Sequence, residues 1–374
     1  MLERMLADIR LPGSEFRGKP FWAWNGKLDP EELRRQIRAM KAMGLGGFFM
    51  HARVGLDTAY LSADWFDCVG ACIDEAEKLG MEAWLYDEDR WPSGQAGGFV
   101  TKNPAHRARM IRLEAVDPER FAWDADTLAA YAAEFDGGAL ARYARLPKGG
   151  KPAIAKGGRL LALRRVIHPS EPWFNGQACV DVLNPAAVKA FLRATHEAYA
   201  KRFGRKFGKS VPGVFTDEVA HMGYDLHPVD SPPGRKNSAP WTEALPRAYR
   251  KRFGLDVFDA LPEVFFDVKG RADRAARWRY HEITTALFAS SFTGQIGEWC
   301  GRRGLLLTGH FNEDDLTTQT ILAGSVLRHY EHMQAPGLDL LTEHWRTFDA
   351  AKQVSSAARQ FGRRTRLTET YGCT

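Results

Sequence analysis

The segment Val214-Phe-Thr-Asp-Glu218 decides how the fold of this 374-residue chain is interpreted. An apolar run over 211–215 stops abruptly at two carboxylates, which is the pattern of a buried strand that ends at a site. The same change from apolar to acidic residues occurs over 81–89, 305–313 and 366–369, each time after a helical pattern. Parallel strands that alternate with helices and carry acids to one rim are typical of a β/α barrel.

Helix signals between the expected strands support this interpretation. Asp29 and Pro30 begin a helix, because Asp is a favoured N-cap and Pro fits the first helical position. Strands are expected at 20–24, 46–50, 82–86, 211–215, 305–308, 337–341 and 365–368. The sequence therefore predicts an α/β fold, a (β/α)8 TIM-type barrel over 1–374, with an antiparallel, β-rich insertion at 105–180 after strand three.

Seven expected strands leave the eighth unaccounted for. Either the count misses one strand, or the chain is a truncated piece of a longer protein. A barrel that lacks a strand exposes two sheet edges, which is unfavourable, so truncation before strand eight is the expectation.

Composition excludes several classes of protein. The formal net charge is +6, but the basic residues are scattered, which predicts a solvated surface and no nucleic-acid partner. The five Cys have neither zinc-site spacing nor the pattern of a disulfide framework. No apolar run is long enough to cross a membrane, and no signal peptide is recognisable. We therefore expect no membrane partner and a cytoplasmic protein as written, or an exported one if the N-terminus is incomplete.

Carboxylates grouped at one rim favour glycoside hydrolysis, which needs two of them. Glu218 is the candidate general acid, because partial burial near other acids raises a carboxyl pKa. Its structural alternative is a helix cap or an Arg partner. Glu313, Glu343 and Glu369 are the candidates for the second catalytic carboxylate. A separation of roughly 5 Å would indicate retention and roughly 6.5–9.5 Å inversion, which the sequence leaves open.

Other polar and aromatic residues near the expected strand ends are candidates for binding a sugar. Carboxylates accept hydrogen bonds from sugar hydroxyls, and a Trp face can stack on a sugar ring. Dense oxygen ligands after strand three could also hold Ca²⁺, although the spacing is not that of an EF-hand, and no metal ligands are assigned. The candidates are His51, Arg53, Asp87, Asp89, Trp91, Asp217 and His310.

Four ordered motifs resemble a known family. They are Pro20-Phe-Trp-Ala-Trp-Asn-Gly-Lys-Leu-Asp-Pro-Glu-Glu-Leu33, Gly46-Gly-Phe-Phe-Met-His-Ala-Arg53, Trp84-Leu-Tyr-Asp-Glu-Asp-Arg-Trp-Pro-Ser-Gly94 and Phe215-Thr-Asp-Glu218. Together they resemble the catalytic barrel of the α-L-rhamnosidases of glycoside hydrolase family 106 and their relatives, from about residue 18 to the end.

The resemblance implies an inverting glycosidase that cleaves terminal α-L-rhamnosyl or similar deoxy-sugar linkages. It implies Glu218 as general acid, Glu313 as the base that activates water, and Glu343 near the same site. It also implies a Ca²⁺ ion that helps to hold the sugar, no organic cofactor, and β-sandwich domains beyond the barrel that this chain lacks. The alternatives are a retaining glycosidase that uses Glu218 and Glu369, a non-catalytic carbohydrate-binding barrel, and an inactive fragment.

Overall fold

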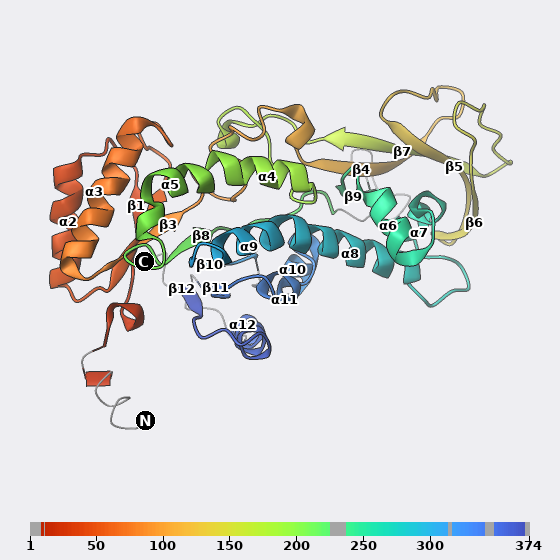
Figure 1. The fold of residues 1–374 in the computed structure, drawn as a ribbon. Coiled ribbons are helices and arrows are strands. Elements are labelled where there is room, and N and C mark those ends of the chain that lie inside the picture. The colour runs from red at the N-terminus through yellow and green to blue at the C-terminus, as the bar shows by residue number, and fades with distance from the viewer. Residues whose placement is uncertain (1–8, 11, 225–236, 313–315, 341–347, 371–374) are drawn as a thin grey trace.

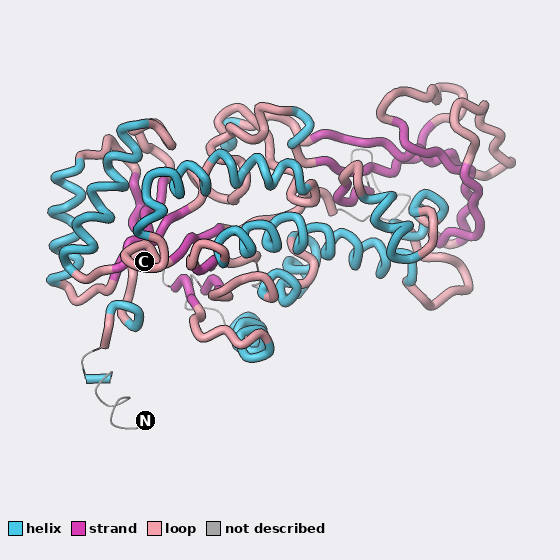
Figure 2. The backbone as a smooth tube through the Cα atoms, in the orientation of Figure 1, coloured by secondary structure: helices cyan, strands magenta, loops and turns pink. Residues whose placement is uncertain are grey.

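A computed structural model describes residues 9–10, 12–224, 237–312, 316–340 and 348–370. The molecule is elongated, with short parallel strands at one end and a long antiparallel sheet at the other (Figure 1). Helices α4 and α8 run between the two ends, and Figure 2 distinguishes helices (cyan) from strands (magenta) in the same orientation.

The parallel strands form two sheets. The first has the order β1-β2-β3-β8-β10, and the second pairs β11 with β12. All pairings within these two sheets are parallel. The bounds are β1 Phe21–Trp24, β2 Gly47–Ala52, β3 Glu82–Tyr86, β8 Gly213–Thr216, β10 Leu306–Gly309, β11 Gly337–Leu340 and β12 Leu367–Thr370.

The prediction of a (β/α)8 barrel is wrong. The parallel strands belong to two separate sheets, and a third sheet is antiparallel. In the described part of the chain no strand pairing joins β12 to β1. Between β10 and the segment before β11, one backbone hydrogen bond runs from Ala335 N to Leu307 O (3.0 Å) instead of a ladder. The expectation of truncation assumed one barrel with a missing eighth strand. The parallel strands do not form one barrel, so a missing strand no longer supports that expectation.

Helices cover the outer face of the first parallel sheet. α2 begins where Asp29 accepts a hydrogen bond from Glu32 N, and α3 begins where Ser62 accepts one from Trp65 N. Leu33 and Ile37 of α2 are buried in the large apolar core. The α-helices are α2 Pro30–Ala42, α3 Ala63–Leu79, α4 Pro185–Ala194, α5 His196–Phe203, α6 Leu245–Phe253, α7 Leu261–Phe265, α8 Ala275–Phe288, α9 Gln295–Gly301, α10 Leu316–Leu322, α11 Val326–Tyr330 and α12 Asp349–Gln360.

Shorter helical segments are also present among the described residues. A π-helical turn, Ala289–Gly294, joins α8 to α9. Turns of 3₁₀-helix lie at Ser14–Phe16, Pro104–His106, Pro172–Phe174, Gly204–Lys206 and Val257–Asp259.

The antiparallel sheet has the order β6-β5-β7-β4-β9. Its bounds are β4 Arg109–Val116, β5 Thr127–Asp136, β6 Ala139–Arg145, β7 Arg159–Ile167 and β9 Asn237–Trp241. Four of these strands lie within 105–180, whereas β9 comes from a later segment in which no strand was expected. A second apolar core, with Leu163 and Trp241 on the sheet and Tyr280 on α8, joins this sheet to the helices beside it.

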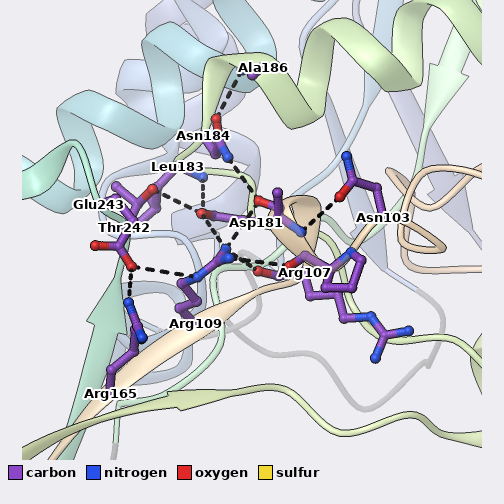
Figure 3. A network of polar contacts seen from close by, with 12 residues as sticks. Asn103, Arg107, Arg109, Arg165, Asp181, Leu183, Asn184, Ala186, Thr242 and Glu243 are labelled. Carbon is purple, nitrogen blue, oxygen red and sulfur yellow. Dashed lines mark hydrogen bonds and ion pairs between the residues drawn. The ribbon is translucent and has the colours of Figure 1, made fainter. Parts of the chain in front are cut away.

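A buried polar network joins the antiparallel sheet to the rest of the molecule (Figure 3). Asp181 Oδ2 accepts a hydrogen bond from Thr242 Oγ1 (2.8 Å) and lies 3.8 Å from Arg109 Nη1, while Asp181 Oδ1 accepts one from Leu183 N (3.1 Å). Glu243 contacts both Arg109 and Arg165. Burial raises the pKa of Asp181 to about 7.

Candidate active site

The inner face of the parallel strands is a layer of aromatic side chains. Phe49 of β2, Tyr86 of β3 and Phe215 of β8 are buried there, with ring centroids 5.5 Å apart for Phe49–Phe215 and 6.0 Å for Tyr86–Phe215. Leu306 of β10 and Leu367 of β12 pack against the same layer. Apolar residues therefore close the inside of the sheet and leave its carboxyl ends to carry polar groups.

Strand alternation places four predicted site residues above this layer. Side chains two positions apart share a face, so His51 follows Phe49, Asp217 follows Phe215, and Glu369 follows Leu367. His310 lies on the same face as Leu306 by the same rule and contacts Phe215, with ring centroids 5.8 Å apart. The structure thus brings side chains from four strand ends to one place.

His310 is at the centre of this group. Its Nε2 lies 3.2 Å from Asp217 Oδ1, 3.2 Å from Glu369 Oε2 and 3.9 Å from Asp339 Oδ2. His310 and Asp217 are buried, and Glu369 keeps 18% of its side chain exposed. Three carboxylates therefore surround one imidazole nitrogen, and these four residues are called the His310 cluster below.

Asp217 is held in its ionised form. Burial alone would raise its pKa, but hydrogen bonding and charge from His310, together with the hydroxyl of Tyr86, lower it below its ordinary value. The Tyr86 hydroxyl donates to Asp217 Oδ2 at 2.6 Å. A buried carboxylate with its charge retained can accept hydrogen bonds from a ligand or bind a cation.

His51 lies against the cluster as a neutral imidazole. Its ring is fully buried and contacts that of Tyr86 at a tilt of 46°, with ring centroids 4.0 Å apart. Burial lowers its pKa to about 3, more than the opposing charge of Asp217 raises it. Within the described ranges neither ring nitrogen of His51 has a hydrogen-bond partner.

The loop after β3 is fixed by two buried acids. Glu88 accepts backbone N–H hydrogen bonds from Asp89, Gly94, Gln95, Ala96 and Gly97. Asp87 accepts the Ser93 hydroxyl (2.5 Å) and lies 3.8 Å from His196 Nε2 on the helix side of the sheet. Ser93 also joins this loop to β8, because its Oγ accepts from Asp217 N at 2.9 Å.

Aromatic residues form an outer rim on this loop. The Arg53 guanidinium lies 4.5 Å from the centre of the Trp91 ring, and Trp91 meets Trp173 edge to face at 4.9 Å. Trp173 Nε1 donates to Trp91 O at 2.6 Å. Asp89 accepts from Asn175 Nδ2 at 2.8 Å, so it anchors the same rim.

Glu218 follows the end of β8 in an unusual backbone conformation. Its φ of 41° lies in the left-handed region, which a residue with a side chain adopts only at a cost. The residue is half-buried, between the buried residues Asp217 and Val219. Strain of this kind at the carboxyl end of a strand is typical of a functional position.

Two predicted catalytic residues, Glu313 and Glu343, lie outside the described residues. Sequence reasoning also missed three residues that the site contains, Tyr86, Asp339 and Trp173. Tyr86 and Asp339 lie within strands, where they were counted as strand residues. An acid inside the short apolar strand Gly337–Leu340 was the available signal for Asp339.

The described cluster does not suit the Ca²⁺ ion that the family resemblance implies. Ca²⁺ takes six to eight oxygen ligands, usually with several waters or carbonyls among them. Here an imidazole nitrogen stands between the carboxylates, and a second imidazole, His51, lies beside them. The donor set of the described residues therefore contains nitrogen at positions where Ca²⁺ would require oxygen.

Comparison with known proteins identifies a similar fold. No protein-family model matches the chain, and no curated protein sequence matches it. Among solved structures the chain is similar to a rhamnosidase from Novosphingobium sp. PP1Y, with 14% sequence identity and a TM-score of 0.66. The similarity covers 97% of this chain and 52% of the rhamnosidase, so the chain spans about half the length of that protein. The chain therefore has a rhamnosidase-like fold.

Across the described residues, no helix combines the length and the apolar character that crossing a bilayer requires.

Proposed function

We propose that this protein is a glycoside hydrolase that cleaves terminal α-L-rhamnosyl or similar deoxy-sugar linkages by inversion, with Glu218 as the general acid. The observation that carries the proposal is the strained, half-buried Glu218 beside the His310 cluster at the carboxyl ends of the strands. The rhamnosidase-like fold over 97% of the chain supports it.

The environment of Glu218 suits an acid. The neighbouring Asp217 is ionised, and a nearby negative charge makes loss of a proton from a second carboxyl less favourable. A carboxyl that keeps its proton near neutral pH can donate it to the oxygen of a leaving alcohol. The left-handed φ of Glu218 turns the backbone away from the extended conformation of the strand that precedes it.

The remaining polar groups suit a sugar. Asp217 can accept hydrogen bonds from sugar hydroxyls at the floor of the site, and Trp91 on the rim offers a face for a ring. Glu313 is the proposed base that activates water, with Glu343 near the same site, as the family resemblance implies. The proposed partner is a carbohydrate alone, without nucleic acid or a membrane.

The decisive experiment compares leaving groups. Wild-type protein and Glu218→Gln are assayed on an α-L-rhamnoside with a poor alcohol leaving group and on one with a dinitrophenyl leaving group. Loss of a general acid should lower turnover by about 10²–10⁴-fold on the poor leaving group. It should have little effect on the activated one, which does not need protonation.

Glu119→Gln is the matched control, because Glu119 is exposed in the turn after β4, far from the parallel strand ends. An equal loss on both substrates would remove Glu218 from the role of acid. Wild-type protein that folds cooperatively but hydrolyses neither α- nor β-glycosides would contradict the enzymatic function itself. Sugar binding by calorimetry without product would then favour a carbohydrate-binding protein.

Stereochemistry is tested separately. The anomer released first, followed by NMR before mutarotation, should be inverted relative to the substrate. A retained anomer would instead favour the alternative in which Glu369 attacks the sugar.

A further inference from the structure

Two carboxylates of the His310 cluster share one basic side chain. Among the ion pairs of the described residues, Asp217 and Glu369 each pair with His310. One imidazole supplies at most a single positive charge to these two carboxylates. Burying carboxylates in excess of their positive partner is costly, so a bound cation would stabilise a group of this kind.

The distances in the cluster match those between ligands that share one metal ion. Oxygen and nitrogen ligands lie about 2.0–2.2 Å from Zn²⁺, so two ligands of a tetrahedron are separated by about 3.3–3.6 Å. Asp217 Oδ1 and Glu369 Oε2 each lie 3.2 Å from His310 Nε2, and ligand atoms of all three residues lie within 4.8 Å of one another. Small outward movements of these side chains would admit an ion.

A second and independent observation comes from His51. This imidazole is fully buried, and among described residues both of its nitrogens lack a hydrogen-bond partner. Its ring contacts that of Tyr86, whose hydroxyl donates to Asp217, so His51 borders the cluster. A buried imidazole without a partner is unfavourable unless a ligand uses its lone pair or its N–H group.

We propose that the His310 cluster binds a first-row divalent transition-metal ion, with Asp217, His310 and Glu369 as ligands and Asp339 and His51 beside them. Imidazole nitrogen combined with carboxylate oxygen favours ions such as Zn²⁺, Fe²⁺ or Co²⁺, whereas Ca²⁺ and Mg²⁺ are held by oxygen alone. The proposal does not depend on the glycosidase function, because it concerns metal binding by the protein without substrate.

Co²⁺ and Zn²⁺ are the probes. The full chain is dialysed against a chelator and then titrated with Co²⁺, and the visible d–d absorption reports both binding and a low coordination number. Zn²⁺ should displace the Co²⁺ and abolish the absorption at one equivalent. Ca²⁺ in large excess should leave it unchanged.

Two variants locate the site. Losing a side chain that only hydrogen-bonds a metal ligand costs about 10–100-fold in metal affinity, so loss of the ligand itself in His310→Ala should weaken Zn²⁺ binding at least that much in calorimetry. Glu369→Gln should weaken it as well, and it is the safer variant because this side chain is partly exposed. His332→Ala, on a half-buried histidine beside Gly297, is the matched control and should bind like the wild type.

Each alternative result overturns the proposal. Folded protein that binds neither Co²⁺ nor Zn²⁺ contradicts a metal site. Displacement of Co²⁺ by Ca²⁺ contradicts the assignment to a transition metal. Unchanged affinity in folded Glu369→Gln and His310→Ala contradicts the location. None of these results bears on Glu218, which the leaving-group assay tests separately.

Discussion

Glu88 is the residue whose replacement tests the architecture of the site most directly. Its carboxylate accepts five backbone N–H groups from the loop that carries Asp89, Trp91 and Ser93. Through Ser93 the same loop is bonded to Asp217 at 2.9 Å. Glu88→Gln keeps the size of the side chain but replaces one accepting oxygen with an NH₂ group that can only donate.

The expected loss of stability follows from which oxygen is replaced. Oε1 accepts two of the N–H groups and Oε2 accepts three, so an amide that is oriented best still loses two bonds. A hydrogen bond to a charged group contributes about 1.5–3 kcal/mol, which predicts a loss of about 3–6 kcal/mol. If the loop opens locally before the protein unfolds, the loss in the free energy of global unfolding cannot exceed the stability of the loop itself.

The assay is urea unfolding followed by circular dichroism at pH 8, above the pKa of about 7 to which burial raises Glu88. Glu119→Gln, on the surface, should change the free energy of unfolding by less than about 0.5 kcal/mol. If Glu88→Gln is as stable as this control, the carboxylate does not hold the loop, and our account of residues 88–97 is refuted.

Three further perturbations test other parts of the structure. Asp181 has a pKa of about 7 in the folded protein against an ordinary value of 3.8, so it binds a proton more tightly when folded. The free energy of unfolding, measured by urea titration at each pH, should therefore fall as pH rises from about 4 to 7, and it should fall less steeply in Asp181→Asn. Gly309→Ala would place a Cβ 1.8 Å from a β8 carbonyl oxygen at a φ of 129°, so it should cost at least about 3 kcal/mol in thermal unfolding, whereas Gly26→Ala has open space and should be neutral. Trp173→Ala removes an aromatic contact worth about 0.5–1.5 kcal/mol and should raise KM up to about tenfold with little change in kcat. Trp123→Ala, in the loop between β4 and β5, is the control, and equal KM values in the two variants would exclude the rim from binding.

The positions of the parallel strands could be predicted because their signals are local. Short apolar runs between capped helices marked all seven, within about two residues at each end. Closure into a barrel depends instead on hydrogen bonds between strands that are distant in sequence, and no local pattern reports those. Alternating strands and helices therefore predicted parallel pairing correctly and the (β/α)8 barrel wrongly.

The strand β9 was missed for a specific reason. Asn237-Ser-Ala-Pro-Trp241 contains polar residues and a proline, which are typical of loops. Among the described strands, β9 lies at the edge of its sheet and pairs with β4 alone, so Pro240 can be accommodated despite its missing N–H. The edge position of this segment follows from the strand order of the sheet, which the sequence does not give.

The same difference between local signals and long-range pairing applies to the site residues. His51, Asp217, His310 and Glu369 were predicted because each follows an apolar strand, and strand alternation then placed them on one face. What no strand end reveals is which of them meet. That His310 lies between two carboxylates depends on the pairing of β8 with β10 and on the approach of β12, each from a different part of the chain.

Alternation also separates two acids that are adjacent in sequence. Asp217 continues the inner face of β8 and joins the His310 cluster, where its charge is retained. Glu218 leaves the extended conformation at a φ of 41°. Two carboxylates that are neighbours in the sequence therefore follow different backbone paths. Different environments can give adjacent carboxylates different roles, which is the premise of the proposed function and of the Glu218→Gln assay.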